Sequence, residues 1–292
     1  MKNNFYISVV GRSNVGKSTL VNFLCNKYVT SSSSKPQTTR INIYNELKIN
    51  DSNIILVDTP GISTKENNLL SKSMQNEYLK ALNSINLLIL VTDSLKFGNF
   101  ENSIINLNSI NNKIIYVINK IDKLKNNEYD LLRSSLKRKY NDKIFFISLL
   151  KKIGLKDFID KGITKNLTSP NNNHQYKKYY NQNKKLFTQE LIRGVIVELT
   201  KFELPYDSAV KVITFTDKKD LKIIKADIYV DKENQKKIII GKNGEMLKNI
   251  GTQSRKILEK NFQCKFFIDL KVLVKKNWKN NYVFLKDLGY IN

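Results

Sequence analysis

The chain has 292 residues, 41% of them hydrophobic and 26% charged, which excludes a collagenous or fully disordered protein and leaves room for two domains. Its apolar runs, such as residues 85–91, are far shorter than the about 18 residues of a transmembrane helix. The formal charge of +24 favours an anionic partner, although a Lys- and Asn-rich composition of genomic origin is an alternative source of that charge. With two cysteines and no signal-peptide pattern, we expect a reduced, soluble, intracellular protein.

The first part of the chain alternates short apolar runs with longer, more polar segments of helical character. The apolar runs lie at residues 5–10, 54–57, 87–91, 114–118 and 144–147. Runs that are apolar on both faces are typical of buried strands in a parallel sheet covered by helices. We therefore expect an α/β domain over residues 1–165, with a mostly parallel sheet and flanking helices.

The pattern changes after residue 165. Residues 168–183 are polar and carry Pro170, which predicts a linker, placed at residues 166–185. Residues 186–292 then predict an α+β domain. Its expected elements are a helix at 186–202 stopped by Pro205, strands at 209–216 and 221–230, a helix at 233–240, a second helix ending near 261 and a strand at 265–275.

Residues 11–18, GRSNVGKS, fit the pattern G-x-x-x-x-G-K-[ST] between a predicted strand and a predicted helix. In such a loop the backbone N–H groups surround phosphate oxygens, and the N-terminus of the following helix adds positive potential. Lys17 would reach the β- and γ-phosphates, and Ser18 would ligate Mg²⁺. The other predicted nucleotide contacts of this segment are Gly11, Asn14, Val15, Gly16 and Thr19.

Asp58 and Gly61 form a D-x-x-G motif directly after the predicted strand at 54–57. A carboxylate at this strand end suits a water-mediated Mg²⁺ contact, and the Gly61 amide suits a contact with the γ-phosphate. Turns that carry Asp are common, so the motif gains its meaning from its place after a buried strand.

A third motif, Asn119–Lys120–Ile121–Asp122, follows the predicted strand at 114–118. The Asp122 carboxylate can accept hydrogen bonds from guanine N1–H and the exocyclic amine, whereas adenine would present an acceptor. Asn119 would tie neighbouring loops together, and the stem of Lys120 would cover the base. Ser148 and Leu149, after the next strand, form either a base-contacting loop or a simple strand end.

Residues 238–250, IIIGKNGEMLKNI, match the I-I-G-x-x-G-x-x-[IL]-x-x-I core of KH domains. The glycines of this loop allow close backbone contact with single-stranded nucleic acid, and lysine adds charge. Lys248 and Arg255 either flank the same groove or belong to a solvated helix face. The loop residues predicted to contact RNA are Gly241, Lys242, Asn243 and Gly244, whereas the predicted core residues are Ile239, Ile240, Leu247 and Ile250.

The nucleotide motifs resemble those of translation-factor-like P-loop GTPases. This resemblance makes residues 35–40, KPQTTR, a switch I segment with Thr39 as an Mg²⁺ ligand and Thr38 as the alternative. Ile62 stands where many regulatory GTPases carry a water-orienting Gln, so turnover would be slow and would rest on Lys17, Thr39, Gly61 and Mg²⁺. By resemblance to potassium-dependent GTPases, Asn14 is a candidate K⁺ ligand.

From end to end the chain resembles the Era family of bacterial GTPases, including ELPY at 203–206 and the tail around Trp278. The resemblance implies an α/β P-loop GTPase domain followed by an α+β type II KH domain. It also implies binding to the 3′ end of small-subunit (16S) rRNA, a nucleotide-switched role in maturing the pre-30S particle, and a cytoplasmic monomer with peripheral contact to the inner membrane. Leu149 and a linker poor in acidic residues depart from the family pattern.

The alternative function is an RNA-binding scaffold with a degenerate, non-hydrolysing G domain. A tRNA-modifying GTPase and a GTPase with tandem G domains are disfavoured, because the motifs occur once and begin near residue 11. His174 lies in the predicted linker, where we expect a solvated side chain. Cys25 and Cys264 are expected to pack in the interior, and Trp278 either anchors the tail or stacks on an RNA base.

Overall fold

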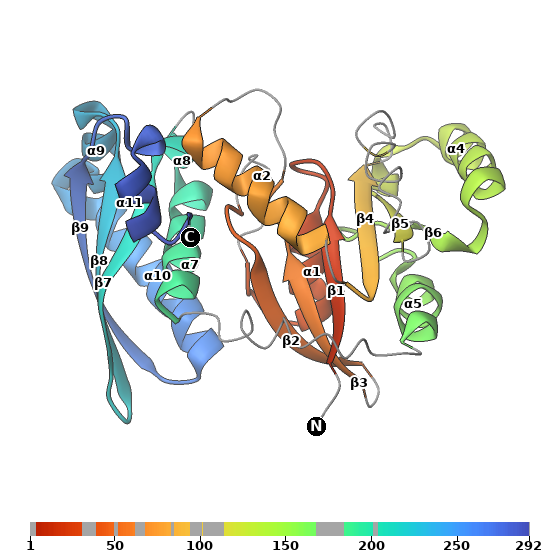
Figure 1. Cartoon of the computed structure of the whole chain (residues 1–292), viewed down its shortest axis with the longest axis horizontal. Helices are drawn as coiled ribbons and strands as arrows, with labels where there is room; N and C mark the ends of the chain where they lie inside the picture. The colour runs from red at the N-terminus through yellow and green to blue at the C-terminus, as the bar shows by residue number, and fades with distance from the viewer. Residues whose placement is uncertain are drawn as a thin grey trace.

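The computed structural model describes residues 4–30, 39–49, 52–61, 68–82, 85–93, 101, 114–167, 184–200 and 204–291. Figure 1 shows a large sheet with helices on both faces beside a smaller sheet with its own helices. Thr38, Ile62, His174 and most of the predicted linker lie outside the described residues. The division into 1–165, 166–185 and 186–292 therefore stays a prediction.

The large sheet has six strands in the order β2-β3-β1-β4-β5-β6. Five of them pair in parallel: β1 (Asn4–Val10), β3 (Ser52–Asp58), β4 (Leu87–Asp93), β5 (Ile114–Asn119) and β6 (Ile144–Phe146). The edge strand β2 (Ile43–Ile49) is antiparallel to β3. The sequence prediction missed β2, because its mixed pattern of buried and exposed residues lacks the continuous apolar run of a central strand.

Helices cover both faces of this sheet. On one face, the side chain of Val9 packs in a core with α1 (Lys17–Cys25) and α5 (Leu155–Asp157). Helix α5 is a single turn that continues as a π-helix at Phe158–Ile163, which packs in the same core. The neighbouring Val10 enters a second core with α2 (Leu69–Leu82) and α4 (Asn126–Tyr140). Since successive strand residues face opposite sides, β1, β4, β5 and β6 each supply both cores.

Short 3₁₀ turns complete the connections between these elements. They lie at Ile121–Lys123, Asn141–Lys143, Thr164–Asn166, Lys242–Gly244 and Trp278–Asn280. Among the described residues, no helix is long and apolar enough to cross a membrane.

The small sheet has the order β7-β8-β9, with β7 (Ala209–Asp217), β8 (Leu221–Val230) and β9 (Lys265–Val274). Strand β8 is antiparallel to β7 and parallel to β9. The parallel pair needs a crossover, which α9 (Glu233–Ile240) and α10 (Glu245–Phe262) provide. Together with α7 (Lys184–Leu199) these helices pack on the sheet, and the resulting α+β order agrees with the KH fold.

Pro205 has a different role from the one that the sequence suggests. Helix α7 ends at Leu199, and Pro205 lies in the first turn of a separate short helix, α8 (Leu204–Asp207). At the first turn of a helix the missing N–H of proline costs nothing and its fixed φ suits the helix. Pro205 therefore belongs to the first turn of α8, which begins at Leu204.

An apolar cluster joins the domain of the large sheet to that of the small sheet. It contains Ile41 and Met74 from the large domain together with Trp278 and Leu288 from the C-terminal segment, which includes α11 (Tyr282–Asp287). The Trp278 side chain is 0% exposed, so the tail-anchor interpretation is confirmed and stacking of this ring on RNA is wrong for this arrangement. The two half-buried cysteines pack against the two domain cores.

Candidate functional site

The loop between β1 and α1 closes tightly around the end of Lys17. Gly16 adopts a φ of 105°, and a Cβ on it would lie 2.3 Å from Nδ2 of Asn119, so no other residue fits. Lys17 is buried, and its Nζ donates a hydrogen bond of 2.7 Å to the carbonyl of Arg12. Burial lowers the pKa of Lys17 to about 8, an effect that the charge of Asp58 opposes.

Gly61 lies against this loop. A Cβ on Gly61 would lie 2.8 Å from Oγ of Ser13 and 3.1 Å from Nζ of Lys17. The fold thus brings the predicted γ-phosphate contact next to the predicted phosphate-binding lysine.

The oxygens of the three predicted metal ligands converge at the end of β3. Oδ2 of Asp58 accepts hydrogen bonds from Ser18 Oγ (2.9 Å) and Thr39 Oγ1 (3.2 Å), and these two hydroxyls are 3.1 Å apart. Thr30, which the sequence argument missed, donates to the same oxygen at 2.7 Å. We refer to Ser18, Thr30, Thr39 and Asp58 as the Asp58 cluster.

The Asp58 cluster fits a magnesium ion. Asp58 is 0% exposed, and its second oxygen, Oδ1, has no hydrogen-bond partner among the described residues. Burial raises the pKa of this carboxyl, while the hydroxyls and Lys17 oppose the rise. A buried carboxylate with a free oxygen and two adjacent hydroxyls is a set of hard oxygen donors, which Mg²⁺ prefers.

Three loops meet at the predicted base site. Asn119 donates from Nδ2 to the carbonyl of Val15 (2.9 Å), and its Oδ1 accepts from the amide of Leu149 (3.3 Å). Asp122 accepts a hydrogen bond from the buried hydroxyl of Ser148. The structure therefore places Asn119 as the tie between loops, with the Asp122 carboxylate held beside it.

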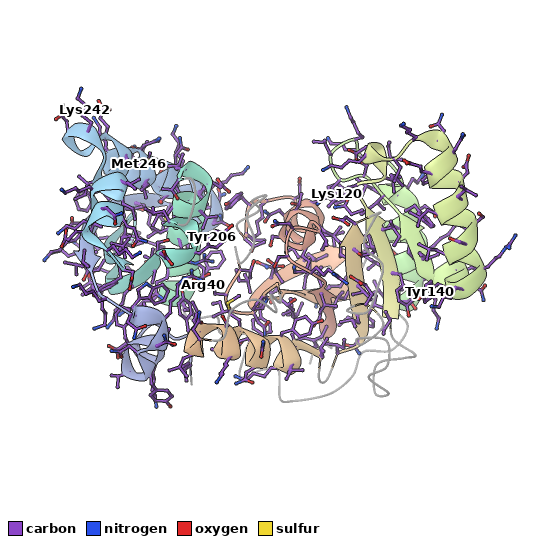
Figure 2. All side chains as sticks on the ribbon, turned by 90° about the horizontal axis from the view of Figure 1, so that it is seen from above. Arg40, Lys120, Tyr140, Tyr206, Lys242 and Met246 are labelled. Carbon is purple, nitrogen blue, oxygen red and sulfur yellow. The ribbon has the colours of Figure 1, made fainter. Side chains whose placement is uncertain are left out.

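Lys120 crosses the same region (Figure 2). Its Nζ donates to the carbonyl of Asn14 and lies 3.7 Å from the Asp93 carboxylate. This places the stem of Lys120 between the phosphate loop and the base loop. Asn14 itself is exposed with a φ of 66°, and its role toward K⁺ stays a prediction.

Arg12 is fixed by a partner that sequence reasoning missed. Its guanidinium makes two hydrogen bonds to Glu101, at 2.9 and 3.0 Å, and the Glu101 side chain is fully buried. This contact raises the pKa of Arg12. The two residues are 89 positions apart, and no motif links them.

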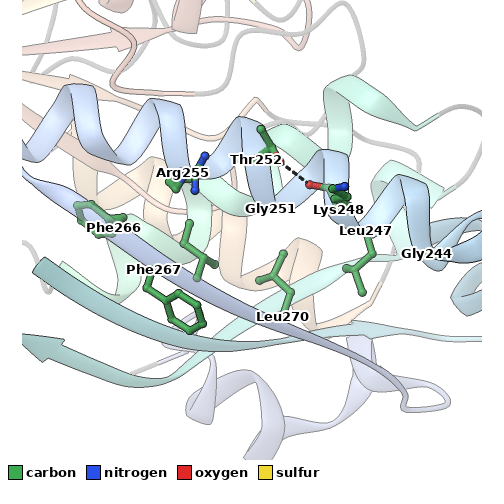
Figure 3. A pocket seen from close by; sticks show the side chains of 10 residues that line it. Gly244, Leu247, Lys248, Gly251, Thr252, Arg255, Phe266, Phe267 and Leu270 are labelled. Atoms are coloured by element: carbon green, nitrogen blue, oxygen red, sulfur yellow. Dashed lines mark hydrogen bonds between the residues drawn. The ribbon is translucent and has the colours of Figure 1, made fainter.

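A groove of about 310 Å³ lies between α10 and β9 (Figure 3). It brings together three predicted RNA contacts, Gly244, Lys248 and Arg255. The residues that sequence reasoning did not propose as RNA contacts are Leu247, Gly251, Thr252, Phe266, Phe267, Ile268 and Leu270. Those on α10 could have been found, because they lie three, seven and eight positions after Gly244, and such positions share one helix face.

The other predicted RNA contacts form the turn that precedes the groove. Gly241 has a φ of 74°, and a Cβ there would lie 2.7 Å from Cβ of Met246. Gly244 has a φ of 79°, but a Cβ there would meet nothing within 4 Å. Gly241 is thus required for the close approach of α9 to α10, whereas Lys242 and Asn243 lie exposed between the two glycines (Figure 2).

The first domain combines a phosphate loop, a buried cluster that fits Mg²⁺ and a loop suited to guanine. The second carries a groove of the KH type. These features define a P-loop GTPase with a KH domain. Comparison with family models agrees: residues 6–120 match "50S ribosome-binding GTPase" and residues 203–279 match "KH domain". The chain belongs to the Era family. It is 36% identical over 298 residues to GTPase Era of Borrelia hermsii, covering 99% of each chain, and 35% identical over 288 residues to GTPase Era of Lactobacillus helveticus, covering 98% of this chain and 95% of the relative.

Solved structures of Era share the whole fold. An Era variant from Aquifex aeolicus bound to GDP·AlF4⁻ has a TM-score of 0.86 at 30% identity, covering 99% of this chain and 100% of the other. An Era structure in complex with MgGDPNP and nucleotides 1506–1542 of 16S ribosomal RNA has a TM-score of 0.86 at 29% identity, covering 100% of both chains. The chain is therefore a GTPase, which converts GTP and water to GDP and phosphate.

Proposed function

We propose that this GTPase binds the 3′ end of 16S rRNA through the groove between α10 and β9, and acts as a nucleotide-switched factor in maturing the pre-30S particle. The observation that carries the proposal is the groove itself, which is flanked by two exposed cations, Lys248 and Arg255. The net charge of +24 suits a polyanionic partner. The Era structure with nucleotides 1506–1542 of 16S ribosomal RNA supports the choice of RNA.

At the nucleotide site, the geometry supports the following roles. Lys17 is positioned to neutralise phosphate charge, and Asp122 to select guanine. Ser18, Thr39 and Asp58 would hold Mg²⁺, which supplies positive charge against the developing charge on the phosphates. The Gly61 amide, next to Lys17, completes the set of donors, and the lack of a Gln after it favours slow turnover. K⁺ near Asn14 is a further proposal.

At the groove, Lys248 and Arg255 would contact phosphates while the apolar lining accepts bases. Single-stranded RNA suits such a site, because its bases are free to leave the stack and contact protein. Phe267 is among the residues that line the groove, but its ring, 57% exposed, lies on the side of β9 that faces away from α10 (Figure 3). It therefore offers a stacking surface at the rim of the groove.

The remaining parts of the proposal concern setting and organisation. We propose a cytoplasmic monomer that contacts the inner membrane peripherally, with a G domain at 1–165, a linker at 166–185 and a KH domain at 186–292. The alternative of a degenerate, non-hydrolysing G domain is not favoured, because the chain belongs to a GTPase family and keeps all the nucleotide residues.

The proposal is tested by measuring GTP and ATP hydrolysis with and without a single-stranded RNA that copies the 3′ end of 16S rRNA. We expect GTP-selective turnover that changes with this RNA and not with a scrambled one. The variant Lys248→Glu should weaken RNA binding, whereas Lys260→Glu, an equally exposed site on α10 outside the groove, should change it less. Equal effects of the two variants, or equal binding of the scrambled RNA, would contradict the proposal.

A further inference from the structure

Arg40 directly follows Thr39 of the Asp58 cluster and reaches across to the KH domain (Figure 2). Its side chain is buried, with 1% of the residue exposed. The guanidinium donates hydrogen bonds to the carbonyl of Ser208 (2.8 Å) and to the carbonyl of Tyr206 (2.8 Å). One peptide unit thus separates a predicted Mg²⁺ ligand from a contact with the other domain.

The guanidinium is also held between aromatic rings. Its central carbon lies 5.3 Å from the ring centre of Trp278 and 5.9 Å from that of Tyr290. Trp278 in turn donates from Nε1 to the carbonyl of Asp207 (3.1 Å). The three consecutive carbonyls at residues 206–208 thus each accept a hydrogen bond: two from Arg40 and one from Trp278.

The charge of Arg40 has no carboxylate of its own among the described residues. Glu190, whose negative charge acts on Arg40, is paired with Arg193 at 2.6 Å and also accepts a hydrogen bond from the hydroxyl of Tyr290 at 2.8 Å. Nε of Arg40 has no described partner. Burial and the charge of Arg193 both lower the pKa of Arg40. A buried cation held by two carbonyls, two ring faces and the side chain of Tyr290 depends strongly on geometry, because a small displacement removes several contacts at once.

We propose that Arg40 is a positioning residue that couples the nucleotide site to the KH domain. Arg40 is joined by one peptide bond to Thr39, whose hydroxyl contacts Ser18 and Asp58, while its guanidinium holds the carbonyls of Tyr206 and Ser208. A shift of either domain is thereby transmitted to the other. This inference rests on the proposed function, since it specifies how nucleotide and RNA sense each other.

Another contact crosses the same interface without touching the Arg40 site. The hydroxyl of Tyr28 bonds Glu198 of α7. Tyr28→Phe removes that hydrogen bond and keeps the ring, so it is the matched control for Arg40. Two variants of Arg40 separate charge from shape. Arg40→Met removes the charge and keeps a side chain of similar length. Arg40→Lys keeps the charge, but its ammonium lacks the planar fork that lets the guanidinium bond two carbonyls while it stacks on aromatic rings.

The first test uses Trp278, the only tryptophan of the chain. Its emission spectrum is recorded for the full-length protein with Mg·GDP and with Mg and a non-hydrolysable GTP analogue. We expect the spectrum to depend on the nucleotide in the wild type and in Tyr28→Phe, and this dependence to be lost in both Arg40 variants. A wild-type spectrum that is the same with both nucleotides overturns the inference, whether or not any variant folds.

The second test measures coupling as the ratio of the dissociation constants of the GTP analogue without and with saturating RNA. Between coupled sites this ratio is typically about 5 to 150 in either direction. We expect such a ratio in the wild type and in Tyr28→Phe, and a ratio near one in Arg40→Met and Arg40→Lys, with RNA affinity in the absence of nucleotide retained. Arg40 variants with wild-type coupling overturn the inference, as does a Tyr28→Phe variant that loses it equally. A wild type that binds no RNA instead contradicts the proposed function, and the Trp278 spectra then still decide the role of Arg40.

Discussion

The nucleotide site and the RNA groove are built in opposite ways. Lys17, Ser18 and Asp58 are each at most 9% exposed. Lys17 is fixed by a hydrogen bond to the carbonyl of Arg12, and Ser18 by one to Asp58. In contrast, Lys248, Arg255 and Phe267 are exposed along an open groove and its rim. A site that stabilises developing charge benefits from fixed groups away from water. A site for a flexible polymer must instead admit bases from outside and gains from charge and stacking. Substitutions should therefore act steeply at the first site and gradually at the second.

The largest effect is expected for Lys17→Ala, which removes the buried ammonium next to Gly61. Turnover of GTP should fall by at least about 100-fold, because a positioned charge acting on the phosphates is lost. RNA affinity measured without nucleotide should stay unchanged. Steady-state hydrolysis and RNA titration check both statements. The control is Lys27→Ala, which removes an exposed lysine just after α1. Turnover close to that of the wild type would show that the closed site does not depend on Lys17.

The next largest effect is expected for Asp122→Asn. The carboxylate accepts from two guanine donors, so the amide should lower GTP affinity by about 100-fold and favour xanthosine triphosphate, which has a carbonyl in place of the amine. Competition between the two nucleotides measures the change. Asp130→Asn, exposed on α4, serves as the control. An unchanged preference for GTP would contradict the assignment of Asp122 to the base.

Phe267→Ala should have a moderate effect that is confined to RNA. Removing a stacking ring costs about 1–3 kcal/mol per base, so RNA affinity should fall by about 5- to 150-fold. Stability should change little, because Phe267 is 57% exposed. Ile213→Ala, 44% exposed on β7 outside the groove lining, is the matched control. If both variants bind RNA equally well, the Phe267 ring at the rim of the groove does not contact bases.

The smallest effect is expected for Gly251→Ala. A Cβ at Gly251 would lie 3.7 Å from Cδ1 of Leu270, an ordinary contact, so the helix should gain about 1 kcal/mol in unfolding free energy. The added methyl takes room from the groove, and RNA affinity should fall by a few-fold. Denaturant unfolding tests the expected rise in stability, and RNA titration tests the expected fall in RNA affinity. Gln253→Ala, exposed on α10, controls for helix propensity alone. Stability and RNA affinity that both rise would show that Gly251 does not serve to keep the groove open.

Much of the fold could be predicted from local patterns. Central strands such as β4 and β5 are recognisable in the sequence as apolar runs, because both of their faces are covered. The loops at 11–18 and 241–244 are recognisable because glycine is favoured at their positive φ angles. The edge strand β2 and the short helix α8 were missed. One face of β2 is partly open, and α8 is only four residues long, so neither leaves a periodic signal.

The candidate sites divide in the same way. Lys17, Asp58 and Asp122 belong to motifs at strand ends, where the carboxyl ends of parallel strands meet. Thr30 in the Asp58 cluster and Glu101 beside Arg12 belong to no motif. Their positions depend on how loops fold back over the sheet, which a single sequence does not display.

The sequence by itself determined the two chemistries of this protein, a GTP site and a KH-type groove, because each is encoded in a short segment whose spacing has a direct physical meaning. Only the tertiary structure decided how they are connected. Arg40 meets the carbonyl of Ser208 across 168 positions, and Tyr28 meets Glu198 across 170. Contacts over such separations arise from the packing of one domain on the other, and neither periodicity nor motif spacing records that packing.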